Sequence, residues 1–304
     1  MIWVTVLVAF AAASVAAPIV FTLMKRIGSR QTVSEHVPEH AKKQGTPTMG
    51  GIIILVGLFA GLVGAPAPML LLLLGFTLVG LLDDFLVPRW LPGKRGLGWL
   101  PKLGLQFGTA GIAAWLGGYT GVALVFATVF LLFAANAYNF LDGLDWLAGT
   151  VGLVLALGLA ALGYFESQQT VTAAMLVLCA SYVPFLVLNK PPAKIFMGDV
   201  GSLPIGGFIG WAALSLGYRP GESLAPPMVA AIAVAMIVLV IEIVPVPLQI
   251  ASAKLRKGRR LFPFRTPVHH AFQHAGWPEP KVVALFAGVQ LACCVAAIAI
   301  ARSA

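Results

Sequence analysis

Ten apolar runs follow one another along the chain and are separated by short, more polar connections. A helix needs about 20 mostly apolar residues to cross a bilayer, and several runs are shorter or contain Gly or Pro. The runs lie near residues 2–24, 51–65, 67–82, 101–117, 120–138, 147–165, 171–188, 203–217, 227–250 and 282–301. This pattern predicts an all-α, polytopic integral membrane protein with about ten transmembrane helices, formed as one domain over residues 1–304.

Composition supports this fold class. The 304 residues are 59% hydrophobic and 10% charged, whereas soluble domains carry roughly 25% charged residues. The net charge of +9 would suggest nucleic-acid binding in a soluble protein. In a membrane protein it reflects Lys and Arg in cytoplasmic loops, so we expect membrane lipids and no nucleic acid as partners. Cys179, Cys293 and Cys294 lie inside apolar runs, without disulfide or metal-ligand spacing.

The first apolar run resembles a signal peptide only in its small residues. No Lys or Arg precedes it, whereas Lys25 and Arg26 follow it. A secretory signal has its positive charges first. We therefore expect an uncleaved first span whose N-terminus lies outside the cytoplasm.

The polar residues are sorted to one side of this topology. Ten spans place both termini on the same side, and all Lys and Arg except Arg219 and Arg302 then fall in inside loops. All five Asp, all five His and all three Asn fall there too. The positive-inside rule does not explain the acidic residues, because they contribute little to orientation. The sorting therefore predicts a site at the cytoplasmic face, built from loops that are distant in sequence.

Two adjacent carboxylates, Asp83 and Asp84, close the third apolar run. They repel each other and are costly to bury, so they need a cation, a proton or water. Magnesium typically uses one or two carboxylates together with substrate phosphates. The alternative is a solvated pair beyond the headgroups, which the apolar residues on both sides disfavour.

The segment from Asn136 to Gly149 carries polar residues at every third position: Asn136, Asn139, Asp142 and Asp145. At about 100° per residue, a continuous helix would put the first and last of them on opposite sides. We expect the helix to break near Gly143, so that these residues share a pocket. Asp142 or Asp145 could then cap the next helix.

A glycine-rich loop precedes the second run, in the string "KKQGTPTMGG". Its close-approach backbone, the Thr48 hydroxyl and the nearby Lys43 could hold a phosphate. The alternative is a plain turn in which Thr48 caps the following helix.

A second glycine-containing loop, "NKPPAKIFMGDVGSL", begins at Asn189. Asp199 lies between Gly198 and Gly201, so backbone can approach whatever the carboxylate binds. Phe196 could stack on a base, although core packing is the simpler interpretation.

The long basic loop 254–281 carries a histidine pair, His269 and His270, which are its best candidates for chemistry. Its Lys and Arg residues would lie near anionic headgroups. Glu242 lies inside the ninth run, and an acid at that depth is a functional candidate or pairs with a neighbouring helix. Pro245 and Pro247 must break or kink that run.

Taken together, these strings resemble the polyprenyl-phosphate N-acetylhexosamine-1-phosphate transferases. "GTPTMGG", "LDDF", "NAYNFLDGLD", "FMGDVGSL" and "TPVHHAF" followed by "GWPEPKV" occur in the family's order between Lys43 and Lys281. The histidine segment with "GWPEP" favours the branch that transfers phospho-N-acetylmuramoyl-pentapeptide. The resemblance implies a magnesium-dependent transmembrane catalytic domain in the bacterial inner membrane, with its active site on the cytoplasmic face. Its partners would be a UDP-sugar donor and a polyprenyl phosphate acceptor, and a homodimer remains open.

The resemblance also implies roles for individual residues. Asp199 would be the magnesium ligand, with Asp83 and Asp84 at the reacting phosphates and as candidates for further ligands. The predicted catalytic residues are Lys43, Asp83, Asp84, Asp199 and His269. The predicted substrate-binding residues are Thr48, Asn136, Asn139, Asp142, Gly143, Leu144, Asp145, Asn189, Phe196 and His270.

The sequence departs from the family's pattern at several positions. Ala271 replaces a usual third histidine, Gln273 replaces a frequent Glu, and Trp146 stands where Gly is common. A Lys that often follows the acidic pair is missing, and we expect Arg89 or Lys94 to substitute for it.

Two other functions remain open from sequence. A relative of the same family could transfer GlcNAc-1-phosphate instead. A transporter with broken helices would place its polar groups near the midplane on paired repeats, but no repeat is present and the polar residues lie at one face.

Overall fold

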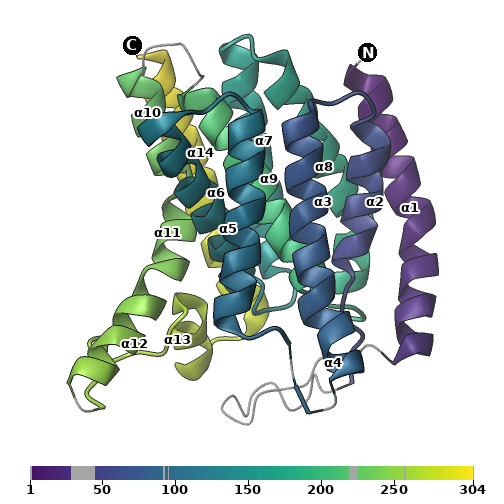
Figure 1. The fold of residues 1–304 in the computed structure, drawn as a ribbon, viewed down its shortest axis with the longest axis vertical. Coiled ribbons are helices and arrows are strands. Elements are labelled where there is room, and N and C mark those ends of the chain that lie inside the picture. Colours follow the sequence, from purple (N-terminus) through teal and green to yellow (C-terminus); the bar gives the residue numbers. More distant parts are fainter. Residues whose placement is uncertain are drawn as a thin grey trace.

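A computed structural model describes residues 2–28, 45–91, 93–94, 96–218, 225–256 and 258–303. These residues form a bundle of helices without any β-strand (Figure 1). Its helices are α1 (Ile2–Ile27), α2 (Gly51–Gly61), α3 (Ala67–Leu81), the π-helical turn η2 (Leu82–Leu86), α4 (Val87–Trp90), α5 (Trp99–Leu116), α6 (Gly121–Leu141), α7 (Leu147–Phe165), α8 (Gln169–Asn189), α9 (Asp199–Gly217), α10 (Pro226–Ala235), α11 (Ile237–Ile243), α12 (Pro245–Leu255), α13 (Val268–His274) and α14 (Glu279–Arg302).

The all-α, polytopic fold class is confirmed, whereas the count of about ten spans is not. Within the described residues, eight helices are long and apolar enough to cross a membrane. They are α1, the continuous Ala67–Trp90, α6, α7, α8, α9, Ile237–Leu255 and α14. α2 and α10 are apolar but shorter, and α5 is not among the eight. The ninth predicted run is divided into α10, α11 and α12, with α12 beginning at Pro245 as expected of a helix-breaking residue.

Helix α9 lies at the centre of the bundle, packed between α3 and α6. Small residues allow this close packing, as is usual between helices in membranes. A Cβ atom on Gly206 would come 2.7 Å from the Ala134 carbonyl oxygen, and one on Gly207 would come 2.7 Å from the Phe76 ring. The start of α9 is packed as closely, since a Cβ atom on Gly80 of α3 would come 2.4 Å from the carbonyl oxygen of Asp199, its first residue.

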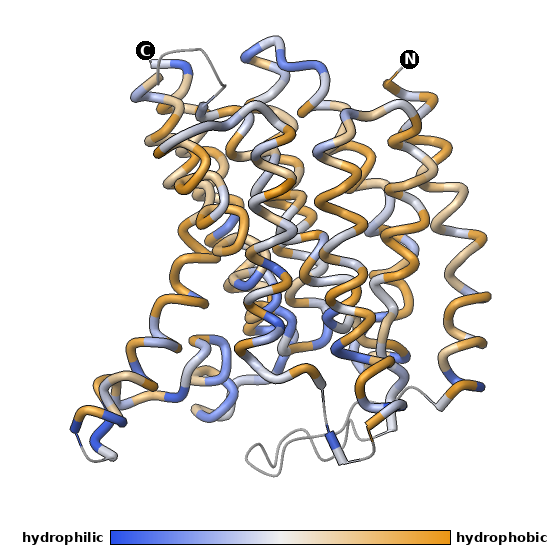
Figure 2. Tube along the Cα trace, viewed as in Figure 1, coloured by the Kyte–Doolittle hydropathy of each residue, from blue (hydrophilic) through white to orange (hydrophobic). Residues whose placement is uncertain are grey.

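The outside of the bundle is apolar, and its two ends differ. Large hydrophobic side chains such as Trp3, Trp115 and Val122 are exposed on outer helices, as expected for a surface in contact with lipid. Both chain ends lie at the same end of the bundle (Figure 1). Hydrophilic segments gather mainly toward the opposite end, which carries α4, α12 and α13 (Figure 2). There the C-terminal ends of α6 and α8 contact the N-terminal ends of α5, α7 and α9 through side-chain hydrogen bonds.

Candidate active site and metal centre

Three carboxylates from two distant parts of the chain form the centre of the polar end. Asp83 and Asp84 lie in the π-helical turn η2, and Asp199 is the first residue of α9. One oxygen atom from each of the three lies within 4.8 Å of the others. Single π-helical turns inside α-helices occur frequently at functional sites. The structure thus gathers the three aspartates that the sequence analysis selected.

The N-terminus of α9 receives the Asp84 carboxylate. The Val200 amide donates a hydrogen bond to Asp84 Oδ2 at 3.0 Å, and the helix dipole favours a negative charge at this position. Gly198, just before α9, has φ 73°, and a Cβ atom there would lie 2.6 Å from Asp84 Oδ2 and 2.8 Å from Thr48 Oγ1. Only glycine fits this backbone conformation and this close approach.

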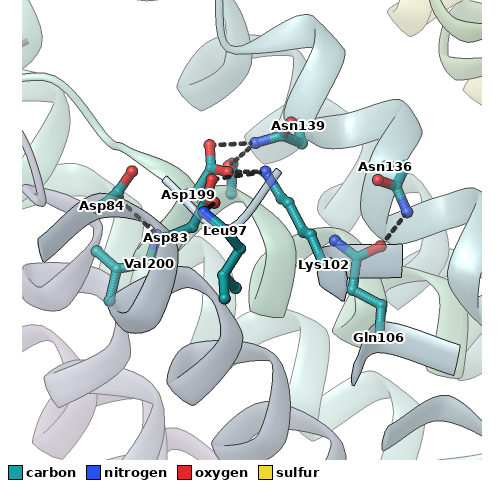
Figure 3. Close-up of polar contacts among 10 residues, drawn as sticks. Asp83, Asp84, Leu97, Lys102, Gln106, Asn136, Asn139, Asp199 and Val200 are labelled. Carbon is teal, nitrogen blue, oxygen red and sulfur yellow. Dashed lines mark hydrogen bonds and ion pairs between the residues drawn. The ribbon is translucent and has the colours of Figure 1, made fainter. Parts of the chain in front are cut away.

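Lys102, near the start of α5, bridges the two sides of the carboxylate cluster (Figure 3). Its Nζ atom donates to Asp83 Oδ2 at 3.0 Å and to an Asp199 oxygen. Asp83 Oδ1 also accepts a hydrogen bond of 2.7 Å from the Leu97 amide. We expected Arg89 or Lys94 to provide a cation, but both are exposed and neither contacts the described carboxylates. The prediction was wrong because Lys102 is brought in from the next helix.

Asn139 belongs to the same cluster, whereas Asn136 does not contact it. The Asn139 amide donates to Asp199 Oδ1 at 2.7 Å and to the Ser202 hydroxyl at 2.8 Å. Asn136 lies one turn earlier in α6 and donates to Gln106 Oε1 and the Leu132 carbonyl, each at 2.8 Å. Figure 3 shows this pair beside the aspartates rather than among them.

The donor set fits a hard divalent cation. Among the described residues, three carboxylates face a single ammonium group, so their mutual repulsion favours a further positive charge. Carboxylate oxygens are the ligands that such cations prefer. The Lys102 ammonium already lies between two of the carboxylates, where a positive charge is most strongly attracted.

The chain breaks between α6 and α7, as expected, but the caps differ from the prediction. α6 ends at Leu141, Asp142 follows it, and α7 begins after Trp146, which has φ 69°. The N-cap residue of α7 is Trp146, which makes no side-chain capping hydrogen bond, rather than the expected Asp142 or Asp145. Asp145 Oδ2 instead accepts a 2.8 Å hydrogen bond from the Ala193 amide.

Asp145 therefore belongs to a second polar group, separate from Asn136. The Trp146 amide donates to Asn189 Oδ1 at 2.8 Å, and Asn189 Nδ2 donates to the Ile195 carbonyl at 2.8 Å. The Asp145 amide donates to Glu279 Oε2 at 3.2 Å. This group joins the α6–α7 turn to the α8–α9 loop, which carries the half-buried Phe196. Asn136 and Asp145 thus belong to different groups of contacts, although the sequence suggests one pocket for the whole segment.

The glycine-rich loop before α2 packs against the α8–α9 loop. The Gly50 and Gly51 amides donate to the carbonyls of Phe196 and Met197, at 2.7 and 2.9 Å. These two amides are therefore not free to hold a phosphate, which is one of the two uses that the sequence suggests for this loop. Thr48 does not cap α2, since Gly50 is its N-cap residue without a side-chain cap. Lys43 lies outside the described residues.

A buried acid–histidine pair lies on the other side of the α6–α7 turn. His269 Nδ1 and Glu242 Oε2 are 2.8 Å apart, the His269 amide donates to Glu242 Oε1 at 3.1 Å, and both side chains are fully buried. A Cβ atom on Gly143 would lie 2.2 Å from His269 Nε2, so the ring packs directly on this glycine. Glu242 is thus paired with a residue on a neighbouring element, one of the two roles that its depth in the ninth run suggests. Within the described part of the chain, His269 does not contact the three aspartates.

The remaining predicted residues lie around the same turn. His270 Nδ1 is 2.9 Å from Gln273 Oε1, so the residue in place of the frequent Glu still pairs with a histidine. Leu144 is buried, and its carbonyl accepts a hydrogen bond of 3.2 Å from the Leu147 amide. Sequence reasoning missed Lys102 and Gln106 as site residues. A Lys and a Gln four positions apart on an apolar helix would have been the signal for them.

Comparison with known proteins agrees with this architecture. The family model described as "Glycosyl transferase family 4" matches residues 67–217, which include the three aspartates and Lys102. The pattern "Phospho-N-acetylmuramoyl-pentapeptide-transferase signature 1" matches residues 43–55.

Several curated proteins named phospho-N-acetylmuramoyl-pentapeptide-transferase are similar over most of their length. The protein of Moorella thermoacetica is 35% identical, over 88% of this chain and 89% of its own. That of Clostridium kluyveri is 33% identical, over 95% and 96%. That of Staphylococcus carnosus is 31% identical, over 94% and 95%. The chain therefore belongs to the phospho-N-acetylmuramoyl-pentapeptide-transferase family.

Proposed function

We propose that this chain transfers phospho-N-acetylmuramoyl-pentapeptide from UDP-N-acetylmuramoyl-pentapeptide to undecaprenyl phosphate, forming lipid I and releasing UMP. One observation supports this most strongly: Asp83, Asp84 and Asp199 converge within 4.8 Å at the polar end of a membrane bundle. A site at that depth can meet a soluble donor and a lipid-borne phosphate together. The identities of the donor and the acceptor follow from the family to which the chain belongs.

The site would hold magnesium through Asp199 together with Asp83 and Asp84. A bound ion would neutralise phosphate charge and help to align the two substrates, which carries much of phosphoryl-transfer catalysis. Lys102 neutralises the carboxylates from the opposite side through its contacts with Asp83 and Asp199. Asn139 orients Asp199 by donating to its Oδ1 atom.

The reaction exchanges one phosphoanhydride for another in a single displacement. An oxygen of the lipid phosphate attacks the β-phosphorus of the donor and forms a new P–O bond. The P–O bond to the bridging oxygen breaks, and UMP leaves with that electron pair. Asp83 or Asp84 would accept a proton from the lipid phosphate; of the two, only Asp83 is already paired with Lys102 and the Leu97 amide.

The second polar group would bind the nucleotide. Asp142, Gly143, Leu144 and Asp145 form the α6–α7 turn, and the α8–α9 loop beside it carries Asn189 and Phe196. Backbone atoms of the turn and the Phe196 ring would contact the uridine. Lys43 and Thr48 would contact phosphate, and His270 the sugar phosphate. His269 is fully buried against Glu242, so it would hold the α6–α7 turn in place rather than touch the substrate.

The proposal includes the location of the protein. Residues 1–304 would form a single catalytic domain that crosses the bacterial inner membrane several times. The end of the bundle that carries the aspartates would face the cytoplasm, where UDP-linked donors are available. Accessibility of engineered single cysteines to a membrane-impermeant reagent would test this orientation.

UMP release by the purified protein tests the activity. We expect release that requires a divalent cation, undecaprenyl phosphate and UDP-N-acetylmuramoyl-pentapeptide, and that is lost in Asp199→Ala. Turnover of UDP-GlcNAc alone would reject the donor, and flux of substrate into vesicles without UMP release would reject the reaction. Radiolabel trapped on Asp83 or Asp84 would replace the single displacement with a covalent aspartyl-phosphate mechanism.

A further inference from the structure

A cavity of about 470 Å³ lies between α5 and α6, directly beside the carboxylate cluster. Its polar lining comes from Asp83, Lys102, Gln106, Asn136 and Asn139, and its apolar lining includes Trp99. Lys102 and Gln106 lie four residues apart, so α5 presents both on the same face. The proposed function uses Asp83, Lys102 and Asn139 but leaves Gln106 without a role.

Gln106 is fully buried, and its amide nitrogen has no hydrogen-bond partner among the described residues. The orientation of the amide is determined by its neighbours. Asn136 Nδ2 must donate to the Leu132 carbonyl, which only accepts, and the same nitrogen donates to Gln106 Oε1. Gln106 Oε1 therefore faces Asn136, and Nε2 is left on the side of Lys102 (Figure 3). A buried donor without an acceptor is costly, so the cavity lacks an acceptor of hydrogen bonds.

The missing acceptor should be anionic. Lys102 uses its ammonium on Asp83 and Asp199 and has three donors in all, so a further donor can point into the cavity next to Gln106 Nε2. Two donors on one helix face, one of them charged, match the oxygens of a phosphate. Asp83 shares the cavity, but its oxygens are already paired with Leu97 and Lys102.

The cavity borders the membrane-facing side of the bundle. Trp99 and Leu103, which line it, have 76% and 39% of their surfaces exposed. Exposed Trp residues are typical of the membrane–water interface. The nucleotide group built on Asp145 and Asn189 lies at the α6–α7 turn instead. A phosphate in this cavity therefore comes from the lipid substrate rather than from UDP.

We propose that the α5–α6 cavity binds the phosphate of the polyprenyl acceptor and that Gln106 donates a hydrogen bond to it, beside Lys102. This assignment rests on the proposed function, because that function supplies the lipid phosphate. In this assignment, Gln106 is a substrate-binding residue that contacts the polyprenyl phosphate and not the UDP-sugar.

Gln106→Met tests this assignment, since it removes the amide and keeps the length of the side chain. The matched control is Gln290→Met: Gln290 is also a fully buried glutamine with one unpartnered polar atom, but its amide contacts Ala235 and Cys294 in another part of the bundle. We expect KM for undecaprenyl phosphate to rise about tenfold or more in Gln106→Met. KM for the UDP-sugar should change less than about twofold, the scatter expected when no contact is lost. Gln290→Met should leave both KM values near those of the unsubstituted protein.

Binding without turnover separates this inference from the proposed function. Undecaprenyl phosphate in nanodiscs should raise the thermal unfolding temperature of the unsubstituted protein and of Gln290→Met in the absence of any UDP-sugar, and raise it much less in Gln106→Met. An equal rise in Gln106→Met would show that the phosphate does not accept a hydrogen bond from the Gln106 amide and that water alone satisfies this amide. That result would overturn the assignment. A larger effect of Gln106→Met on KM for the UDP-sugar would place the donor's phosphates in the cavity and would also overturn it. Absence of UMP release by the unsubstituted protein would instead reject the proposed function.

Discussion

Lys102 and Asp199 form an ion pair that joins the start of α5 to the start of α9. The two residues are 97 positions apart in the chain. The same ammonium group also contacts Asp83 at 3.0 Å, so one cation connects both sources of the acidic cluster. About a fifth of each of these side chains is exposed, so the cluster is shielded from water but reachable.

Removing this ammonium should expose the repulsion within the cluster. Lys102→Met should lower kcat/KM by about 100-fold or more and destabilise the protein by on the order of 2 kcal/mol, because the carboxylates lose their partner. Added Mg²⁺ should raise the unfolding temperature more in Lys102→Met than in the unsubstituted protein, since the ion would replace the lost charge. The exposed Lys94 gives the control: Lys94→Met should change neither quantity. An unchanged response to Mg²⁺ would contradict a metal site at these carboxylates.

The two adjacent aspartates should differ in their contribution. Asp84→Asn removes one of the two carboxylates proposed to accept the proton, the one that Lys102 does not neutralise, so kcat should fall by about 100-fold or more. The substituted amide oxygen can still accept from the Val200 amide, so stability should change little. Asp83→Asn weakens the pairing with Lys102 and should alter both stability and the requirement for metal. Rates and unfolding temperatures of both variants, measured over several Mg²⁺ concentrations, test this difference. Equal losses in kcat and in stability would show that the pair acts as one unit.

The Glu242–His269 pair should act mainly on stability. Both side chains are fully buried, and leaving one of such a pair without its partner costs about 3–5 kcal/mol. Glu242→Ala and His269→Ala should each lower the unfolding temperature strongly, while the double variant should lose less than the sum of the two. Unfolding in detergent measures this coupling. An additive double variant would mean that the two residues act independently of each other.

The sequence predicts which residues belong to the site better than it predicts which of them contact one another. Gly143 and the three-residue spacing of Asn139, Asp142 and Asp145 correctly indicate a helix break, because backbone preferences are local. Lys102 is not evident, because it follows a loop and resembles one more positive-inside residue. The pairing of Lys102 with Asp199 depends on how α5 packs in the bundle, and local sequence does not determine that packing. Asp145 likewise finds its partner, the Ala193 amide, across a tertiary contact rather than at the helix start beside it.

The glycine-rich loop before α2 is a second case in which tertiary contacts, rather than local sequence, determine what the residues do. Gly45, Gly50 and Gly51 near a lysine suggest a phosphate loop, yet the Gly50 and Gly51 amides are paired with the carbonyls of Phe196 and Met197. The reason for glycine at position 51 is a crossing of two backbones. A Cβ atom there would lie 2.2 Å from the Cα atom of Gly201. Sequence pattern cannot separate this use of glycine from ligand binding, because both require a bare backbone.

That crossing makes a sharp prediction about stability. Gly51→Ala and Gly201→Ala each place a methyl group against backbone that cannot rotate away, so each should destabilise the protein by about 3 kcal/mol or more. Activity should fall as well, because Gly201 lies two residues after Asp199 and the strain would shift the start of α9. Gly104→Ala and Gly108→Ala are matched controls, since a Cβ atom on either glycine meets nothing within 4 Å. Alanine at these helical positions should leave stability unchanged or raise it by up to about 1 kcal/mol. Thermal unfolding and UMP release, measured for all four variants, test this packing. Similar values for Gly51→Ala and Gly104→Ala would contradict it.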